Sequence, residues 1–253
     1  MNLIPLKTLL LREIRRFLRI WPQTVLPAAM TSGLYFLIFG QLIGSRIGAM
    51  NGVSYMDYIL PGVLLMSVIN NAYTNVSSSF FSTKFQRNIE ELLVAPIPPW
   101  MILTGFVGGG IMRAAVVASV TYLMSRLFSD WTPVNLPVVA GMFFLTALLF
   151  SLAGFINALF ANNFDDISIV PNFILTPLVY LGGVFYSIDM LPPLWRSLSA
   201  WNPIFYMVHA FRYGFIGQAD VTPALAFAVL SGLNISLIAL SLILLHRGTG
   251  LKS

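Results

Sequence analysis

Residues 131–164 read WTPVNLPVVAGMFFLTALLFSLAGFINALFANNF, a run of 34 residues without a charged side chain. A helix of about 20 apolar residues crosses roughly 30 Å of hydrocarbon, so this run is long enough for one membrane crossing, which we place at Pro137–Phe160. The whole chain has the same character, because 57% of its 253 residues are hydrophobic and only 9% are charged, against about 25% in a soluble domain. This composition excludes a soluble enzyme, a nucleic-acid-binding protein and a disordered protein, and it predicts an all-α integral membrane protein.

Five other charge-poor windows are each long enough to cross a membrane. Only one of them contains a charge, Arg113. The windows are Trp21–Gly44, Tyr58–Thr83, Ile97–Ser125, Ile167–Ile188 and Val221–Leu245. Six transmembrane helices are therefore predicted. The segment 189–220 is also apolar, but prolines and arginines divide it into halves that are shorter than a crossing, and we expect a re-entrant or interfacial helix pair there.

The distribution of lysine and arginine predicts the orientation of the spans. With the N-terminus inside, nine basic residues lie in inner segments and four lie in outer segments. Basic residues near span ends favour the cytoplasm, so both termini are expected there; a true crossing within 189–220 would put the C-terminus outside and agrees less well. The first span exceeds the apolar core of about 7–15 residues in a cleaved signal peptide, so we expect it to be retained. Residues 1–253 are expected to form one transmembrane domain.

Two cytoplasmic segments have the periodicity of amphipathic helices. In residues 1–20, apolar side chains recur every three or four positions with arginines between them, which is typical of a helix at the membrane surface. In residues 84–96, KFQRNIEELLVAP, the apolar side chains share one helical face and prolines end the helix. The first helix is either an anchor only or also a contact surface for a cytoplasmic partner. The second is more than a connection of about 2–8 residues needs, so we favour a partner contact over a solvated loop.

The second inner loop, residues 161–166, reads ANNFDD. Asn163 or Asp165 is expected to cap the helix that follows, because their side chains accept hydrogen bonds from the free amides of a first helical turn. Two adjacent aspartates have poor geometry for a metal ion, so capping or a partner contact is the favoured interpretation.

Motifs for catalysis and for cofactor binding are missing from the sequence. None of the three lysines follows a glycine, so the phosphate loop G-x-x-x-x-G-K-[ST] does not occur. His209 and His246 do not form a zinc motif, and the nucleophile turn G-x-S-x-G is absent. We therefore expect no catalytic residue, no metal site and no cofactor bound by this chain.

Charged and polar residues within the spans bear on the energy source. All nine acidic residues map to span ends or loops, so a carboxylate relay for protons or sodium is not expected, and energy is expected from outside the chain. Arg113 lies inside a span and is expected to face the bundle or to snorkel. Mid-span asparagines such as Asn71 are expected to form interhelical hydrogen bonds rather than to contact substrate, and Gly105-x-x-x-Gly109 predicts close helix packing.

The last third of the chain carries a family resemblance. Residues 175–193 read LTPLVYLGGVFYSIDMLPP, followed by WNP at 201–203 and FRYG at 211–214. This pattern, with a glycine-rich fifth span, a Leu-Pro after it and an Asn-Pro in the re-entrant piece, resembles the permease subunits of ABC-2 type ATP-binding-cassette exporters. The run FQRNIEELLVAP at 85–96 is similar to the first coupling helix of these permeases. The resemblance covers essentially the whole chain.

The resemblance implies a homodimer in a bacterial inner membrane, in contact with membrane lipid and with no role for nucleic acid. Two copies of a separate ATPase subunit would bind ATP and Mg and dock on the cytoplasmic side. The residues expected to face the ATPase are Arg15, Arg16, Arg87, Glu90, Glu91, Asp165 and Asp166. The residues expected on a translocation path between the first, second and fifth spans are Tyr35, Asn71, Phe173, Thr176 and Tyr180. The residues expected in an external gate are Pro192, Pro193, Asn202, Pro203 and Arg212.

Two other functions stay open at this point. An ion-driven secondary transporter would need a titratable group near the membrane midplane, and a membrane assembly protein would move nothing. The cargo does not follow from the sequence, since aromatic residues, 13% of the chain, suit an amphiphile but also fill any membrane bundle.

Overall fold

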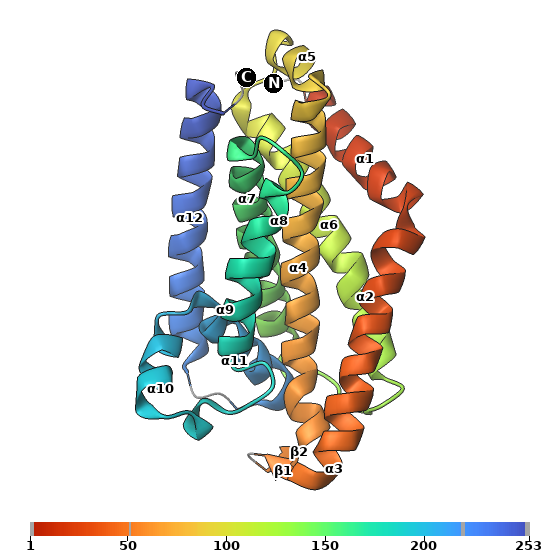
Figure 1. Cartoon of the computed structure of the whole chain (residues 1–253), viewed down its shortest axis with the longest axis vertical. Helices are drawn as coiled ribbons and strands as arrows, with labels where there is room; N and C mark the ends of the chain where they lie inside the picture. The colour runs from red at the N-terminus through yellow and green to blue at the C-terminus, as the bar shows by residue number, and fades with distance from the viewer. Residues whose placement is uncertain (1–2, 51, 219–220, 251–253) are drawn as a thin grey trace.

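A computed structural model describes residues 3–50, 52–218 and 221–250 and shows a bundle of long helices (Figure 1). The start of α1 and the end of α12 lie at the same end of the bundle, beside α5. The helices in chain order are α1 (Ile4–Arg19), α2 (Trp21–Tyr35), η1 (Phe36–Ile43), α3 (Gly44–Ile47), α4 (Tyr55–Phe85), α5 (Asn88–Val94), α6 (Pro99–Ser125), α7 (Leu136–Phe160), α8 (Asp166–Ile169), η2 (Val170–Leu175), α9 (Thr176–Leu181), η3 (Ile188–Met190), α10 (Pro193–Ala200), α11 (Pro203–Ile216) and α12 (Pro223–Arg247).

Helix α4 forms the centre of the bundle, and most of its 31 residues are buried. It packs chiefly against α6 and α7. The approach to α7 is close because Gly154 has no side chain: a Cβ there would lie 2.5 Å from the carbonyl oxygen of Tyr73. The asparagines and serines of the second predicted span therefore lie against protein rather than lipid, which lowers the cost of placing them in a membrane.

Four helical stretches in the described part of the chain are long and apolar enough to cross a membrane. They are Trp21–Ile47, Pro99–Ser125, Leu136–Phe160 and Pro223–Arg247. These stretches agree with four of the six predicted crossings. Helix α4 has sufficient length for the second crossing, but its polar side chains keep it out of this group.

The fifth predicted crossing, Ile167–Ile188, is helical over only part of its length. Its helix ends at Leu181, because Gly183 adopts a φ of 75° that continues no right-handed helix. The segment Asp166–Leu181 has 16 residues, or about 24 Å of helix, against roughly 30 Å of hydrocarbon. The predicted boundary at Ile188 is therefore wrong for the helix.

The amphipathic helix α1 packs against α6, where glycines make room for it. A Cβ at Gly105 would lie 2.8 Å from Cβ of Leu9, and a Cβ at Gly109 would lie 2.5 Å from Cβ of Glu13. The predicted close packing of Gly105-x-x-x-Gly109 is confirmed, and its partner is α1. Leu9, Glu13 and Phe17, which recur every four residues, form the buried face of α1.

The opposite end of the bundle carries a small hairpin and two short helices. Strand β1 (Ala49–Met50) pairs antiparallel with β2 (Val53–Ser54), the single departure from an all-α fold among the described residues. The helix pair predicted within 189–220 corresponds to α10 and α11, which lie at this end away from the start of α1 (Figure 1).

Candidate functional site

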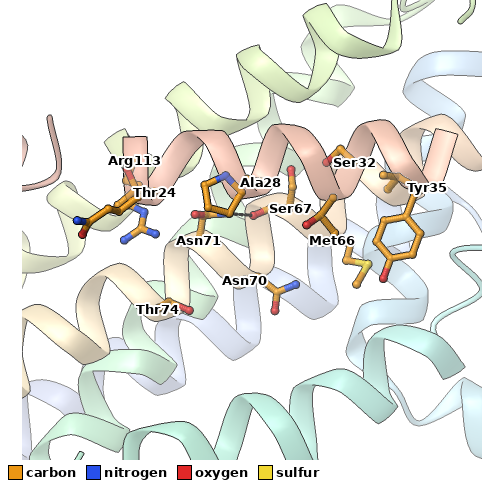
Figure 2. A pocket seen from close by; sticks show the side chains of 14 residues that line it. Thr24, Ala28, Ser32, Tyr35, Met66, Ser67, Asn70, Asn71, Thr74 and Arg113 are labelled. Atoms are coloured by element: carbon orange, nitrogen blue, oxygen red, sulfur yellow. Dashed lines mark hydrogen bonds between the residues drawn. The ribbon is translucent and has the colours of Figure 1, made fainter. Parts of the chain in front are cut away.

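A polar pocket of about 280 Å³ lies between α2, α4 and α6 (Figure 2). Hydroxyl and amide side chains make up most of its lining, and Arg113 is its one charged residue. Thr24 and Tyr35 of α2 lie at opposite ends of the pocket, and Arg113 lies beside Thr24 (Figure 2). Asn71 of α4 lies between these two ends. The pocket therefore has a cationic end and an aromatic end.

Long hydroxyl contacts link the pocket walls. Ser32 Oγ lies 3.4 Å from Thr121 Oγ1, which donates to Ser67 Oγ at 3.4 Å. These contacts join α2, α6 and α4. Asn71 donates from Nδ2 to the carbonyl oxygen of Ser67 at 3.0 Å. This bond lies within α4, so the prediction of an interhelical bond from Asn71 is wrong.

Arg113 is buried at the cationic end of the pocket. Its side chain is only 9% exposed, and its Nε has no hydrogen-bond partner in the part of the chain that the structure describes. No ion pair among those residues involves it, and its electrostatic neighbour is a second cation, Arg16. The expectation that Arg113 faces the bundle is confirmed.

Glu13 of α1 is a buried carboxylate, 1% exposed, and the sequence did not predict this burial. Arg16 Nε and Arg12 Nη2 contact its two oxygens at 3.3 and 3.4 Å, and Ser79 Oγ donates to it at 2.5 Å. Arg16 also donates to Oδ1 of Asn75 at 2.8 Å, an interhelical bond of the kind predicted for the asparagines. Together these contacts fasten α1 to α4.

A larger cleft of about 940 Å³ opens between α1 and α4 near the start of α5. Arg12, Arg15, Arg16 and Arg19 contribute four cations to its lining, and Asn88 of α5 also lines it. The cleft therefore brings the predicted interface helix and the predicted coupling helix to one surface. Arg15 is exposed, whereas Arg16 is partly buried where it pairs with Glu13.

The charged residues of α5 lie on the surface at this end of the bundle. Arg87, Glu90 and Glu91 are all exposed. Arg87 adopts a φ of 61°, the one non-glycine residue with a left-handed backbone in the described part of the chain. This turn sets the direction of α5 relative to α4.

The loop 161–166 is connected to the same surface by hydrogen bonds. Lys84 Nζ donates to the carbonyl oxygens of Leu159 and Ala161 at 2.7 and 2.9 Å. Asn163 Oδ1 accepts from the amide of Asp166 at 2.9 Å, which confirms one of the two predicted caps. The carboxylate of Asp166 accepts loop amides in return, so Asp165 is the more available of the pair.

The structure brings some of the expected translocation-path residues together. Tyr35 and Asn71 line the polar pocket, and the hydroxyl groups of Tyr35 and Tyr180 lie 3.4 Å apart. Phe173 and Thr176 are exposed and lie outside the pocket lining, Phe173 with 76% exposure. Sequence reasoning weighed Arg113 only as a packing or snorkelling residue, although a lone charge within a span is a signal for a polar cavity.

The expected gate residues have mainly structural contacts. Pro192 and Pro193 begin α10. Asn202, just before Pro203, caps α11 by accepting from the amide of Ile204 at 3.0 Å and donates to the carbonyl oxygen of Leu178 at 2.6 Å.

Arg212 joins α11 to the rest of this end of the bundle. It donates to the hydroxyl of Tyr58 at 2.9 Å and to the carbonyl oxygen of Gly183 at 2.7 Å. Its guanidinium also lies over the ring of Tyr58, 3.8 Å from the centroid. These bonds connect α11, α4 and the turn after α9.

Comparisons with known proteins agree with this architecture. Residues 5–216 match the family described as ABC-2 type transporter. The inner membrane transport permease YadH of Escherichia coli (strain K12) is 53% identical over 250 residues, which cover 99% of this chain and 98% of YadH. Nodulation protein J of Rhizobium leguminosarum bv. viciae is 24% identical over 208 residues, which cover 78% of this chain and 76% of that protein.

Proposed function

The chain belongs to the ABC-2 type transporter family, and on that premise we propose that it is the permease subunit of an ATP-binding-cassette exporter driven by separate ATPase subunits. Its relative YadH is an inner membrane transport permease, which supports a transport permease of the inner membrane here. The missing phosphate loop agrees with ATP hydrolysis on another chain.

One observation carries this proposal: residues of α1 and α4 connect the cleft beside α1 to the polar pocket. Arg16 of α1 lines the cleft and bonds Asn75 of α4. Asn75 lies one helical turn from Asn71, which lines the pocket. A protein that docks on α1 and α5 and shifts them would therefore move α4 and the pocket wall. A permease powered from outside its own chain needs such a connection.

The proposal includes six crossings with both termini in the cytoplasm. Helix α4 would be the second crossing and α8–η2–α9 the fifth. A second copy of the chain is proposed to cover the face formed by α2, α4 and α9, where Tyr35 and Tyr180 meet. Exposed apolar side chains on both flanks of α4, among them Leu34 and Phe173, support this face as an interface or a lipid contact.

The direct test is reversal of the charge on α5. With Glu90→Lys and Glu91→Lys combined, the ATPase subunit should no longer co-purify in mild detergent, or its ATP hydrolysis should become independent of the permease. Asp130→Lys is the matched control, because Asp130 is an exposed carboxylate at the opposite end of α6. Retention of a fully coupled ATPase in the double variant would refute the docking surface, and purification of the parent protein with no ATPase at all would refute the proposed function.

The buried carboxylate of Glu13 favours a second candidate, an ion-driven carrier, because such carriers use buried carboxylates. Two guanidinium groups and a hydroxyl already occupy this carboxylate, an arrangement suited to holding helices together. Transport by the reconstituted chain alone under a proton or sodium gradient would establish the carrier, whereas transport that requires ATP and the ATPase would exclude it.

A further inference from the structure

We propose that the polar pocket binds the anionic head group, a phosphate or a similar oxyanion, of an amphiphilic cargo, and that Arg113 is its ligand. This inference rests on the proposed function, because it assigns a chemical class to the cargo of the permease. Two observations support it: Arg113 lies at one end of the pocket, and apolar and aromatic side chains lie toward the other end.

The local charge balance leaves room for an anion. Arg12, Arg16 and Arg113 gather where α1 meets α4 and α6, and Glu13 is the only buried carboxylate in the described part of the chain. Glu13 is already in contact with Arg12 and Arg16. Among the residues that the structure describes, Arg113 is therefore left without a counter-ion.

A buried cation without a counter-ion is expensive within a membrane. An arginine at the centre of a transmembrane helix costs roughly 2.5–3.5 kcal/mol on insertion scales, and intramembrane charges are paired or line a functional cavity. A guanidinium offers five N–H donors in a planar fork that fits a phosphate or carboxylate. An oxyanion in the pocket would supply both the missing charge and the missing acceptors.

The rest of the lining fits a head group with an apolar tail. Thr24 lies beside Arg113, and Asn70 and Asn71 line the pocket between Arg113 and its other end (Figure 2). These residues supply hydroxyl and amide groups to a head group. Toward the other end lie Met66 and Tyr35, an apolar and an aromatic side chain. A volume of about 280 Å³ accepts a head group and the first part of a chain, and the remainder of the chain would extend along α2 into lipid.

The experiment is a binding titration of the full-length protein in dodecyl maltoside, followed by native mass spectrometry. The probes are decyl phosphate, decyl glucoside with the same chain and a neutral head, and inorganic phosphate. Decyl phosphate should bind at least tenfold more tightly than either other probe. Equal binding of decyl glucoside would refute the anion site, and equal binding of inorganic phosphate would refute an amphiphilic ligand.

Variants separate the site from general partitioning into the micelle. Arg113→Gln should weaken decyl phosphate binding at least tenfold, and Arg113→Lys should restore part of it. Asn71→Asp should weaken binding as well, because it supplies a carboxylate inside the pocket while leaving Arg113 in place. The control is Arg46→Gln, which removes an exposed arginine of α3 and should change nothing; binding that is equal in all four variants and the parent protein would overturn the proposal.

Co-purification of the ATPase is scored in the same preparations. If decyl phosphate shows no preferential, Arg113-dependent binding while the ATPase still associates, this inference alone is refuted. Arg113-dependent binding in a protein that associates with no ATPase would support the anion site and refute the exporter.

Discussion

Arg113 and Arg212 are the two buried arginines of the described bundle, and their surroundings differ. Arg212, 3% exposed, donates to acceptors on Tyr58 and Gly183 and lies over an aromatic ring. Arg113, 9% exposed, faces a polar pocket and takes part in no ion pair among the described residues. The first arginine holds three segments together, whereas the second is placed where a ligand enters. Burial alone therefore does not distinguish a structural cation from a binding one; the acceptors around it do.

The largest effect is expected from removing the satisfied arginine. Arg212→Met should lower the free energy of unfolding by about 3 kcal/mol or more, because hydrogen bonds to a charged donor contribute about 1.5–3 kcal/mol each and their acceptors would be left buried. Tyr58→Phe, which removes one of these acceptors, should cost about 1–2 kcal/mol. Denaturation of the purified protein in detergent measures both, and a loss no greater than that of Arg46→Met would contradict the structural role.

The next effect concerns the carboxylate that fastens α1 to α4. Glu13→Gln should lower the free energy of unfolding by about 2 kcal/mol, because it leaves the partly buried cation Arg16 and the exposed Arg12 without their counter-ion. It should also reduce permease-dependent ATP hydrolysis. Glu90→Gln, at an exposed position, is the control for stability and should have no measurable effect on unfolding. Equal stability of the two variants would rule out the proposed fastening.

A smaller effect is expected from crowding the contact between α1 and α6. Gly109→Ala places a methyl group 2.5 Å from Cβ of Glu13 and should cost about 1–3 kcal/mol, since overpacked sites must shift backbone or side chains. Gly232→Ala is matched to it, because a Cβ at Gly232 meets nothing within 4 Å, and it should be neutral or stabilising by up to about 1 kcal/mol. Thermal unfolding of both variants tests this packing of α1 on α6. Equal unfolding midpoints for the two variants would contradict it.

The smallest effect concerns the left-handed turn before α5. Arg87→Gly should stabilise the turn by about 1 kcal/mol, whereas Arg87→Val should destabilise it by a similar amount, because a β-branched residue avoids positive φ. Both variants remove the charge of residue 87, so measuring ATPase association separates the contribution of the charge from that of the turn conformation. Equal loss of association in both would assign the role to the charge, and loss in Arg87→Val alone would assign it to the turn.

Much of the fold follows from periodicity and from charge-free length. The amphipathic helix α1, the short helix α5 and the helix pair within 189–220 were all predictable, because each has its own pattern of apolar residues, prolines and arginines. The second crossing was predicted from an absence of charge, although its asparagines and serines make it less apolar than a lipid-facing helix. The structure explains this composition, since most of α4 is buried against other helices of the chain.

The candidate site was only partly predictable. Tyr35 and Asn71 were named for the translocation path and do line the pocket, but Phe173 and Thr176 do not. The burial of Glu13 was not predicted, although Leu9, Glu13 and Phe17 recur every four residues and so share one face. The pocket itself could not be read from the sequence, because its walls come from three helices that are far apart in the chain.

The most direct test compares the two buried arginines in one measurement, the thermal unfolding midpoint with and without decyl phosphate. Arg212→Met should lower the midpoint strongly and keep the rise that decyl phosphate causes in the parent protein. Arg113→Met should leave the midpoint unchanged or higher, because it removes an unpaired buried cation, and should abolish the rise. A midpoint that falls as far in Arg113→Met as in Arg212→Met, with the response to decyl phosphate retained, would contradict the assignment of Arg113 to ligand binding.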